Sequence, residues 1–208
     1  MSAFIEQLQH QLTLPLPGQA AQHRMANTFR RKNTTPPADA RIACVLALFY
    51  PKDEQWHLVL IQRVSHDRRD RHSGQISFPG GKLEKSDPSL LDGALREAEE
   101  EVGVPAEMVQ PLGRLTQLYI PVSNFLVHPF VGVANERPNF QPQLSEVQAI
   151  LEVPFSQLQN PANIQQTNLK ISDHLVLKDV PYYDIQGHVV WGATAMMLSE
   201  LLEVVGRN

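Results

Sequence analysis

An acidic segment with an apolar stripe constrains the fold of this chain more than any other feature. Between residues 90 and 103 the apolar side chains recur every three or four positions, which is the spacing of one helix face. We expect Asp87 to cap this helix, Pro88 to lie in its first turn and Gly103 to end it. The segment therefore predicts a short helix that buries one side. The stripe consists of Leu91, Ala94, Leu95, Ala98 and Val102.

The opposite side of this helix carries a run of glutamates. Glu97 and Glu101 are four residues apart and stack on one face, and Glu100 adjoins them. Like charges at this spacing destabilise an isolated helix by about 0.2–0.5 kcal/mol per pair. A hard divalent cation such as Mg²⁺ or Mn²⁺ would remove this repulsion. A solvated acidic face is the alternative, but the tight Gly80–Gly81 turn in front of the helix favours a built site.

The rest of the chain alternates runs of strands with helices at the two ends. This order predicts an α+β fold with a mixed sheet, in which residues 41–208 form the domain. We expect residues 1–40 to form a helix followed by an irregular lead-in. The predicted strands cover 41–50, 56–63, 76–81, 112–120, 125–134, 146–153, 169–177 and 188–191, and further helices cover 3–12 and 193–205.

Composition narrows the class of partner. The net charge of −4 argues against non-specific binding of nucleic acid, and no apolar run reaches the length of about 20 residues that a membrane span needs. The one cysteine, Cys44, has apolar neighbours and is expected to be a buried thiol. The first residues lack the basic start and apolar core of a signal peptide, so we expect a cytoplasmic protein.

The acidic helix and the loop before it resemble the Nudix box. The pattern is Gly-x5-Glu-x7-Arg-Glu-U-x-Glu-Glu-x-Gly-U, with U aliphatic, and residues 96–104 match its second half throughout. The first half differs, because 15 positions separate Gly81 from Arg96 where the pattern has 14. The early glutamate is also missing, and Asp87 lies near its place.

The resemblance implies an α/β/α sandwich around a mixed sheet and hydrolysis of a nucleoside diphosphate linked to another group. It implies Mg²⁺ or Mn²⁺ as cofactor, with Glu97, Glu100 and Glu101 as metal ligands. Arg96 would orient a glutamate, and Glu99 is the variable position that faces water. A glutamate outside the box often serves as base or extra ligand in this family. The catalytic residues implied are Arg96, Glu100 and Glu146.

The segment in front of the box, residues 62–81, resembles the additional signature of the coenzyme A diphosphatase branch. It has an arginine after an apolar strand, a basic group, a Gly-Gln pair and Phe-Pro-Gly-Gly. The longer box loop is a feature of the same branch. The resemblance implies coenzyme A or an acyl-CoA as substrate, with arginines binding its phosphates. The implied substrate-binding residues are Arg63, Arg68, Arg71, His72, Gly74, Gly80 and Gly81.

Two other functions stay open at this point. The same chemistry could act on ADP-ribose, a dinucleotide or an oxidised nucleotide, although the basic loop favours coenzyme A. A Nudix domain kept only for ligand binding would be expected to lose box carboxylates, and Glu97, Glu100 and Glu101 are all present. Homodimers are frequent in the family, so a homodimer is also open.

Overall fold

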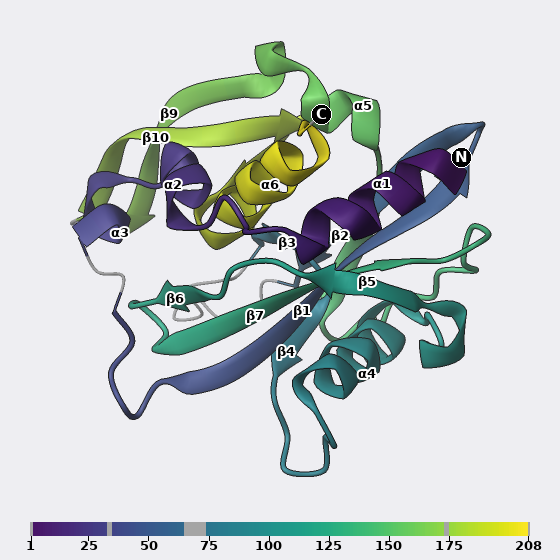
Figure 1. Cartoon of the computed structure of the whole chain (residues 1–208). Helices are drawn as coiled ribbons and strands as arrows, with labels where there is room; N and C mark the ends of the chain where they lie inside the picture. The colour runs from purple at the N-terminus through teal and green to yellow at the C-terminus, as the bar shows by residue number, and fades with distance from the viewer. Residues whose placement is uncertain (1, 33–34, 65–73, 173–174, 208) are drawn as a thin grey trace.

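The computed structural model describes residues 2–32, 35–64, 74–172 and 175–207 (Figure 1). Its helices are α1 (Ser2–Thr13), α2 (Gln19–Gln22), α3 (Thr28–Lys32), α4 (Leu90–Val102), α5 (Phe155–Gln159) and α6 (Gly192–Val205), with 3₁₀ turns η1 (His23–Met25), η2 (Ala106–Met108) and η3 (Pro161–Asn163). Its strands are β1 (Arg41–Lys52), β2 (Gln55–Arg63), β3 (Ile76–Ser77), β4 (Gly80–Lys82), β5 (Gln110–Arg114), β6 (Leu118–Ile120), β7 (Phe125–Val133), β8 (Val147–Pro154), β9 (Ile164–Ser172), β10 (Leu175–Ile185) and β11 (His188–Trp191).

Strand β1 is buried on both faces and lies at the centre of the fold. Because side chains alternate along a strand, Ala47 and Phe49 enter one apolar cluster, whereas Leu46 and Leu48 enter the other. The first cluster contains residues of α1 and α6, and the second contains Ala98 of α4. One strand therefore separates the two cores and contributes to both of them.

The main sheet is mixed, as the sequence predicts. Its central order is β3-β2-β1-β7-β5, with β4 paired to β1, β6 to β7 and β8 to β2. Strands β1 and β2 form an antiparallel hairpin whose two-residue turn, Asp53 and Glu54, has positive φ at both positions, whereas β1 and β7 run parallel. The remaining strands, β9, β10 and β11, form a separate three-stranded sheet.

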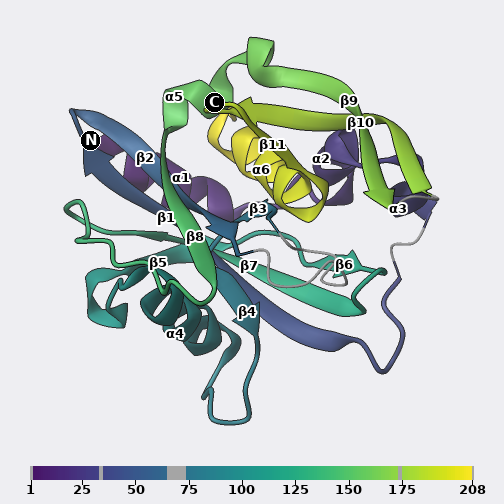
Figure 2. The ribbon, with the colours of Figure 1, turned by 180° about the vertical axis from the view of Figure 1, so that it is seen from behind.

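The layers follow from this sheet. Figure 1 shows α4 on one side of the main sheet, and α1, α6 and the small sheet on the other. Figure 2, from behind, shows β8 near the centre of the view; it belongs to the main sheet and pairs antiparallel with β2. The predicted α+β fold with helices around a mixed sheet is confirmed. Within the described ranges, no helix is long and apolar enough to cross a membrane.

The segment before β1 is more regular than the sequence suggests. It contains α2, η1 and α3 where an irregular lead-in is expected, because these turns are too short to show helical periodicity. Ala21, Met25 and Ala26 are buried, and the latter two join the same apolar cluster as Leu198 of α6. The division into residues 1–40 and 41–208 stays a prediction, but part of the first segment packs into the core of the second.

A buried carboxylate ties this N-terminal segment to the end of the chain. Glu200 of α6 is 0% exposed and accepts hydrogen bonds from Gly18 N (3.1 Å), Gln22 Nε2 (2.8 Å) and Thr116 N (3.2 Å). A buried carboxylate without such donors would be costly. Glu200 therefore holds together three segments that are far apart in the sequence.

Three strand predictions are wrong in detail. The strand expected over 76–81 is two short strands, β3 and β4, which pair with β2 and β1 respectively. The strand expected over 112–120 is interrupted between β5 and β6, because the amide of Thr116 turns to Glu200 instead of to a neighbouring strand. The strand expected over 169–177 covers the end of β9 and the start of β10, two arms of one hairpin. Val176 in this hairpin is 51% exposed. Cys44 is buried and free, as expected.

A charge cluster joins β1, β8 and the loop after β7. Glu152 accepts hydrogen bonds from Tyr50 Oη (3.0 Å), Lys52 Nζ (3.1 Å) and both Nε and Nη2 of Arg137 (2.7 Å each). These donors, Arg137 first, lower the pKa of Glu152 from 4.5 to about 2. A carboxylate with a lowered pKa in the folded protein stabilises the fold above its unfolded pKa.

We predict that Glu152→Gln lowers the free energy of unfolding at pH 7, and that the difference from wild type shrinks as the pH falls from 4.5 towards 2. The stabilisation is lost in this window because Glu152 itself becomes protonated. Urea unfolding at several pH values measures it. Glu6→Gln, an exposed change on α1, is the control. A difference that stays constant down to pH 2 would contradict the prediction.

Candidate active site

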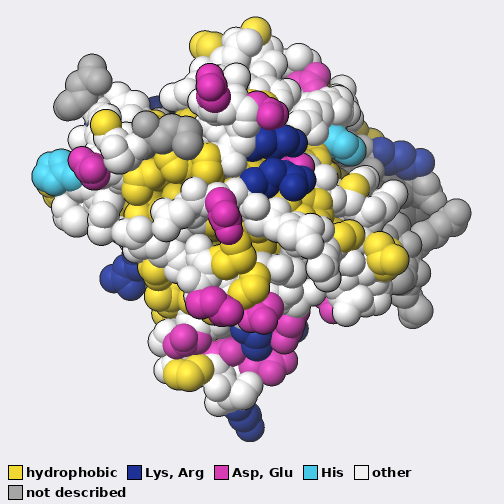
Figure 3. Space-filling view, turned by 90° about the vertical axis from the view of Figure 1, so that its right-hand side faces the viewer, with side chains coloured by type: hydrophobic (Ala, Val, Ile, Leu, Met, Phe, Trp, Pro, Cys, Tyr) yellow, Lys and Arg dark blue, Asp and Glu magenta, His cyan; other side chains and the backbone are white. Residues whose placement is uncertain are grey.

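The acidic residues lie on a helix with defined ends. The α4 helix begins after Ser89, whose hydroxyl accepts from Asp92 N (3.2 Å), and ends at Gly103 with φ of 71°. Its buried residues include Ala94, Ala98 and Val102 of the predicted stripe, while Leu91 and Leu95 are half-buried. Figure 3 shows acidic side chains gathered at the lower end of the molecule, where α4 lies, with basic atoms among them.

Glu101 is the most deeply buried of the α4 glutamates. Its side chain is 2% exposed, and its two oxygens accept from Arg63 Nη1 (2.9 Å) and Gly80 N (2.8 Å). Burial nevertheless raises its pKa to about 7, because these two donors offset only part of the desolvation and Glu97 and Glu146 add like charge. The end of β2 and the start of β4 thus meet at this one carboxylate.

Glu97 lies against the glycine pair. A Cβ on Gly81 would be 2.6 Å from the carboxylate carbon and both oxygens of Glu97, so any other residue would displace this carboxylate from its observed position. Gly80 has φ of 151°, and a Cβ there would be 2.4 Å from Cys44 O on β1. Burial raises the pKa of Glu97, and Arg96 opposes this shift. The glycine pair therefore lets β4 lie between β1 and the acidic face of α4.

Arg96 organises the outer part of the cluster. Its guanidinium contacts Glu97 Oε1 (3.1 Å) and Glu100 Oε2 (2.8 Å) through Nη1, and Lys82 O (3.2 Å) through Nη2. Hydrogen bonds to Asp87 are the largest cause that raises the pKa of Arg96. Glu100 is 58% exposed at the side chain and Glu99 is exposed without such a contact. Arg96 therefore pairs with Glu97 and Glu100, not with Glu99.

The expectation that Asp87 caps the helix is wrong. The cap is Ser89, two residues later, so Pro88 also lies before the helix and not in its first turn. Asp87 instead accepts from Arg96 Nε (2.8 Å) and Nη2 (3.1 Å), and from Glu84 N (2.7 Å). This bidentate pair lowers the pKa of Asp87. In the sequence, the indication that Asp87 belongs to the site was its position near the missing glutamate of the box.

The structure describes only some of the other predicted site residues. Glu146 is exposed, but its backbone O accepts from Val64 N (2.8 Å), next to Arg63, and its charge raises the pKa values of both Glu97 and Glu101. Gly74 has φ of 69°, and no atom of the described residues lies within 4 Å of a Cβ built on it. Three predicted substrate-binding residues lie outside the described ranges: Arg68, Arg71 and His72.

Comparison with known protein families identifies the family of this chain. Residues 40–175 match the NUDIX domain, which spans β1, the glycine pair, α4 and Glu146. The chain belongs to the Nudix hydrolase family. The family and hydrolase predictions are confirmed at this level.

Curated relatives carry the same family name. A protein from Enterobacter sp. (strain 638), named uncharacterized Nudix hydrolase NudL, is 37% identical over 158 residues, which cover 74% of this chain and 77% of that protein. A protein of the same name from Yersinia pestis (strain Pestoides F) is 32% identical over 207 residues, 99% of this chain and 94% of the relative. The second alignment includes the segment before β1.

A solved structure shares the fold. The MutT protein from Methanosarcina mazei Go1 has a TM-score of 0.52 and 15% identity, and the match covers 81% of this chain and 96% of that one. At this identity the likeness concerns the fold alone. It agrees with the mixed sheet and flanking helices of this Nudix domain.

The Nudix box acids form a donor set suited to a hard cation. Glu97, Glu100 and Glu101 offer only oxygen atoms from one helix, and Glu146 adds its charge. Burial raises the pKa values of Glu97 and Glu101, which a nearby cation would counteract. As placed, no three acid, histidine or cysteine side chains of the described residues converge as a metal site. The box carboxylates contact Arg63 and Arg96 instead.

We predict that Gly81→Ala weakens Mn²⁺ binding about 10- to 100-fold, because the new methyl group displaces the Glu97 carboxylate. The thermal midpoint should change little, since the displaced group is the flexible end of a side chain. A Mn²⁺ titration followed by electron paramagnetic resonance measures the affinity. Gly206→Ala, at the end of α6, is the control. Unchanged affinity in Gly81→Ala would show that Glu97 does not bind the metal.

Asp87→Asn removes the charged partner of Arg96 and leaves the box glutamates in the sequence. We predict a loss of Mn²⁺ affinity or turnover of about 10- to 100-fold, since Arg96 loses the group that fixes its orientation. Asp92→Asn, on the first turn of the same helix, should stay near wild type because Asp92 is exposed and contacts Ser89. Equal effects of the two changes would exclude a positioning role for Asp87.

Proposed function

We propose that this Nudix hydrolase cleaves the diphosphate of coenzyme A or an acyl-CoA in the presence of Mg²⁺ or Mn²⁺. The products would be 3′,5′-ADP and 4′-phosphopantetheine or its acyl form. The observation that supports this substrate class most strongly is the contact between Arg63 and Glu101. It places Arg63, the first arginine of the segment 62–81, against Glu101, the most buried carboxylate of the box. An anionic substrate bound by the basic segment would therefore lie next to the metal-binding acids.

The proposed reaction is attack of water on one phosphorus of the diphosphate. A divalent cation held by Glu97, Glu100 and Glu101 would supply charge neutralisation and activation of water. The P–O bond to the bridging oxygen breaks, and the leaving phosphate takes the electron pair. Glu146 is the proposed acceptor of the water proton, because it is exposed and interacts electrostatically with the buried glutamates.

The arginines have separate roles in this proposal. Arg96, fixed by Asp87, orients Glu97 and Glu100 and thereby the ligand oxygens. Arg63 is 30% exposed at its side chain and has donors beyond the one used by Glu101, so it can also bind a phosphate oxygen. Arg68, Arg71, His72 and Gly74 remain predictions from sequence. The cytoplasmic location, a homodimer, and the absence of nucleic-acid and membrane partners also remain predictions.

Product analysis over a panel of diphosphates tests the substrate. The panel holds coenzyme A, an acyl-CoA, 3′-dephospho-coenzyme A, ADP-ribose, a dinucleotide and an oxidised nucleotide, each with Mg²⁺ or Mn²⁺. We predict that coenzyme A or its thioester gives the highest kcat/KM and yields 3′,5′-ADP. Glu101→Gln should reduce turnover to background on every member, because one metal ligand and the partner of Arg63 are lost.

Each other outcome has a defined meaning. Cleavage of ADP-ribose with coenzyme A untouched would make the substrate proposal wrong and leave the Nudix chemistry intact. Near-normal rates for a folded Glu101→Gln would make the metal site wrong. Binding of a panel member without any cleavage would favour a ligand-binding module.

A further inference from the structure

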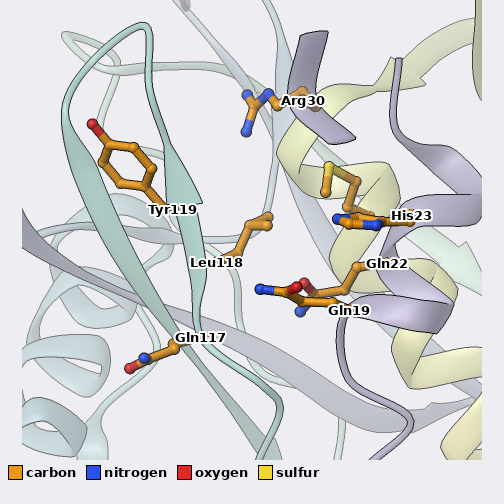
Figure 4. A pocket seen from close by; sticks show the side chains of 8 residues that line it. Gln19, Gln22, His23, Arg30, Gln117, Leu118 and Tyr119 are labelled. Carbon is orange, nitrogen blue, oxygen red and sulfur yellow. The ribbon is translucent and has the colours of Figure 1, made fainter. Parts of the chain in front are cut away.

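A small polar pocket lies away from the box, between β6 and the N-terminal helices. Figure 4 shows Arg30 of α3 above Leu118 in this view, with Tyr119 on one side and His23 on the other. Its enclosed space is about 10 Å³, within a recess of about 240 Å³ that includes the open mouth. The enclosed part is the size of one water molecule or one oxygen atom of a larger group. The lining residues are Gln19, Gln22, His23, Arg30, Gln117, Leu118, Tyr119 and Met196.

The guanidinium of Arg30 lines this pocket from α3. Its Nη1 is buried and has no hydrogen-bond partner within the described ranges. Desolvation lowers its pKa only to about 10, so the group stays charged at neutral pH. Arg30 as a whole is half-buried, but a buried N–H without a partner is unfavourable, and proteins normally satisfy it. The position therefore calls for a negatively charged ligand or for solvent.

The acidic side chains that α6 directs towards the N-terminal segment are already engaged. Glu200 accepts from Gly18, Gln22 and Thr116, as described above. Glu203 forms an ion pair with Arg24 at 2.7 Å. Tyr119 donates its hydroxyl to Asn124 Oδ1 (3.0 Å). None of these groups turns to Arg30, although they belong to the elements that pack around the pocket.

The start of α6 adds a second favourable feature. A Cβ built on Gly192, the first residue of α6, would be 4.0 Å from Arg30 Nη2. The first turn of a helix presents free N–H groups and positive potential, which favour an anion. The same turn is joined to the main sheet, since Thr194 donates to Ile76 O (2.9 Å) on β3. The start of α6 thus lies beside the Arg30 guanidinium, while Met196 is the residue of α6 that lines the pocket itself.

We propose that this pocket binds a phosphate group, with one phosphate oxygen taken up by Arg30 of α3. The remaining oxygens occupy the open mouth, where His23 and Gln19 can donate hydrogen bonds. The site lies outside the Nudix box and outside the basic segment. The phosphate is either a distal phosphate of the substrate or free phosphate, and the two sources differ in their competition with substrate.

The competing occupant is a single buried water. Gln22 also lines the pocket, and its Oε1 is a buried acceptor without a partner in the described part of the chain. One water could accept from Arg30 and donate to Gln22, which would satisfy both atoms without any anion. The two occupants differ in one measurable respect, because only phosphate binding saturates as phosphate is added.

The test is a titration of the full chain with inorganic phosphate, in EDTA and at constant ionic strength with chloride as the balancing anion. EDTA removes divalent cations, which would otherwise bring phosphate to the box. The readout is the amide NMR signals of Gln19, His23 and Tyr119. We predict saturable shifts in wild type and at least tenfold weaker binding in Arg30→Gln. Lys32→Gln is the matched control, because it removes one positive charge from the exposed end of the same helix.

The wild-type titration alone can overturn the proposal. Shifts that rise linearly without saturation, or no shifts at these residues, would mean that the pocket holds only water. Equal affinity in Arg30→Gln and Lys32→Gln would mean that phosphate binds elsewhere. If Arg30→Gln does not fold by circular dichroism, Arg30→Lys replaces it. That variant keeps the charge and loses the guanidinium geometry, so unchanged affinity would again exclude the site.

Substrate competition then identifies the source of the phosphate. If it belongs to coenzyme A, unlabelled coenzyme A displaces inorganic phosphate from these signals, and Arg30→Gln raises KM for coenzyme A more than for 3′-dephospho-coenzyme A. If it is free phosphate, the shifts persist with saturating coenzyme A. Either result supports a phosphate site at Arg30. Failure of coenzyme A cleavage would change neither reading of the phosphate titration, so this inference and the proposed function fail separately.

Discussion

The close approach of β4 to β1 is the constraint on which the site depends. Strand β1 is buried on both faces, and Gly80 and Gly81 pair with Val45 and Cys44 in its centre. Side chains at these two glycines would strike β1 backbone on one side and Glu97 on the other. Because neither position carries a side chain, the amide of Gly80 reaches Glu101 and the carboxylate of Glu97 lies over Gly81. Packing of the core and placement of the acids are therefore one requirement.

The cluster that results is a balance between carboxylates and two arginines. Arg63 comes from the end of β2 and contacts Glu101, whereas Arg96 is part of α4 itself and contacts Glu97 and Glu100. Desolvation still raises the pKa values of the two inner glutamates. The two arginines therefore do not fully compensate the negative charge of the buried glutamates. A divalent cation would add the missing positive charge. An anionic substrate bound together with this cation would then meet no net repulsion from the glutamates.

The sequence predicted those features that a local pattern can carry. The helical spacing of Ala94, Ala98 and Val102 identified α4, and the box pattern identified the family. It placed the cap at Asp87, because a proline and an acid near a helix start are locally ambiguous, whereas the choice of Ser89 depends on Arg96 drawing Asp87 away. The pairing of Arg63 with Glu101 spans 38 residues and depends on strand β2. The burial of Arg30 Nη1 depends on tertiary packing around a pocket that Met196 of α6 also lines, so the sequence neighbours of Arg30 could not indicate it.

The carboxylate of Glu200 has a consequence for the order in which the molecule can fold. Its donors Gly18 and Gln22 are synthesised early, and Thr116 lies in the middle of the chain. The acceptor, Glu200, is on the final helix and is synthesised last. During synthesis the first helices have no such partner until residue 200 has left the ribosome. Their burial against α6 is therefore a late event in biosynthesis. A chain that stops before α6 would leave the apolar residues of its first helices exposed, and would offer them to chaperones and proteases.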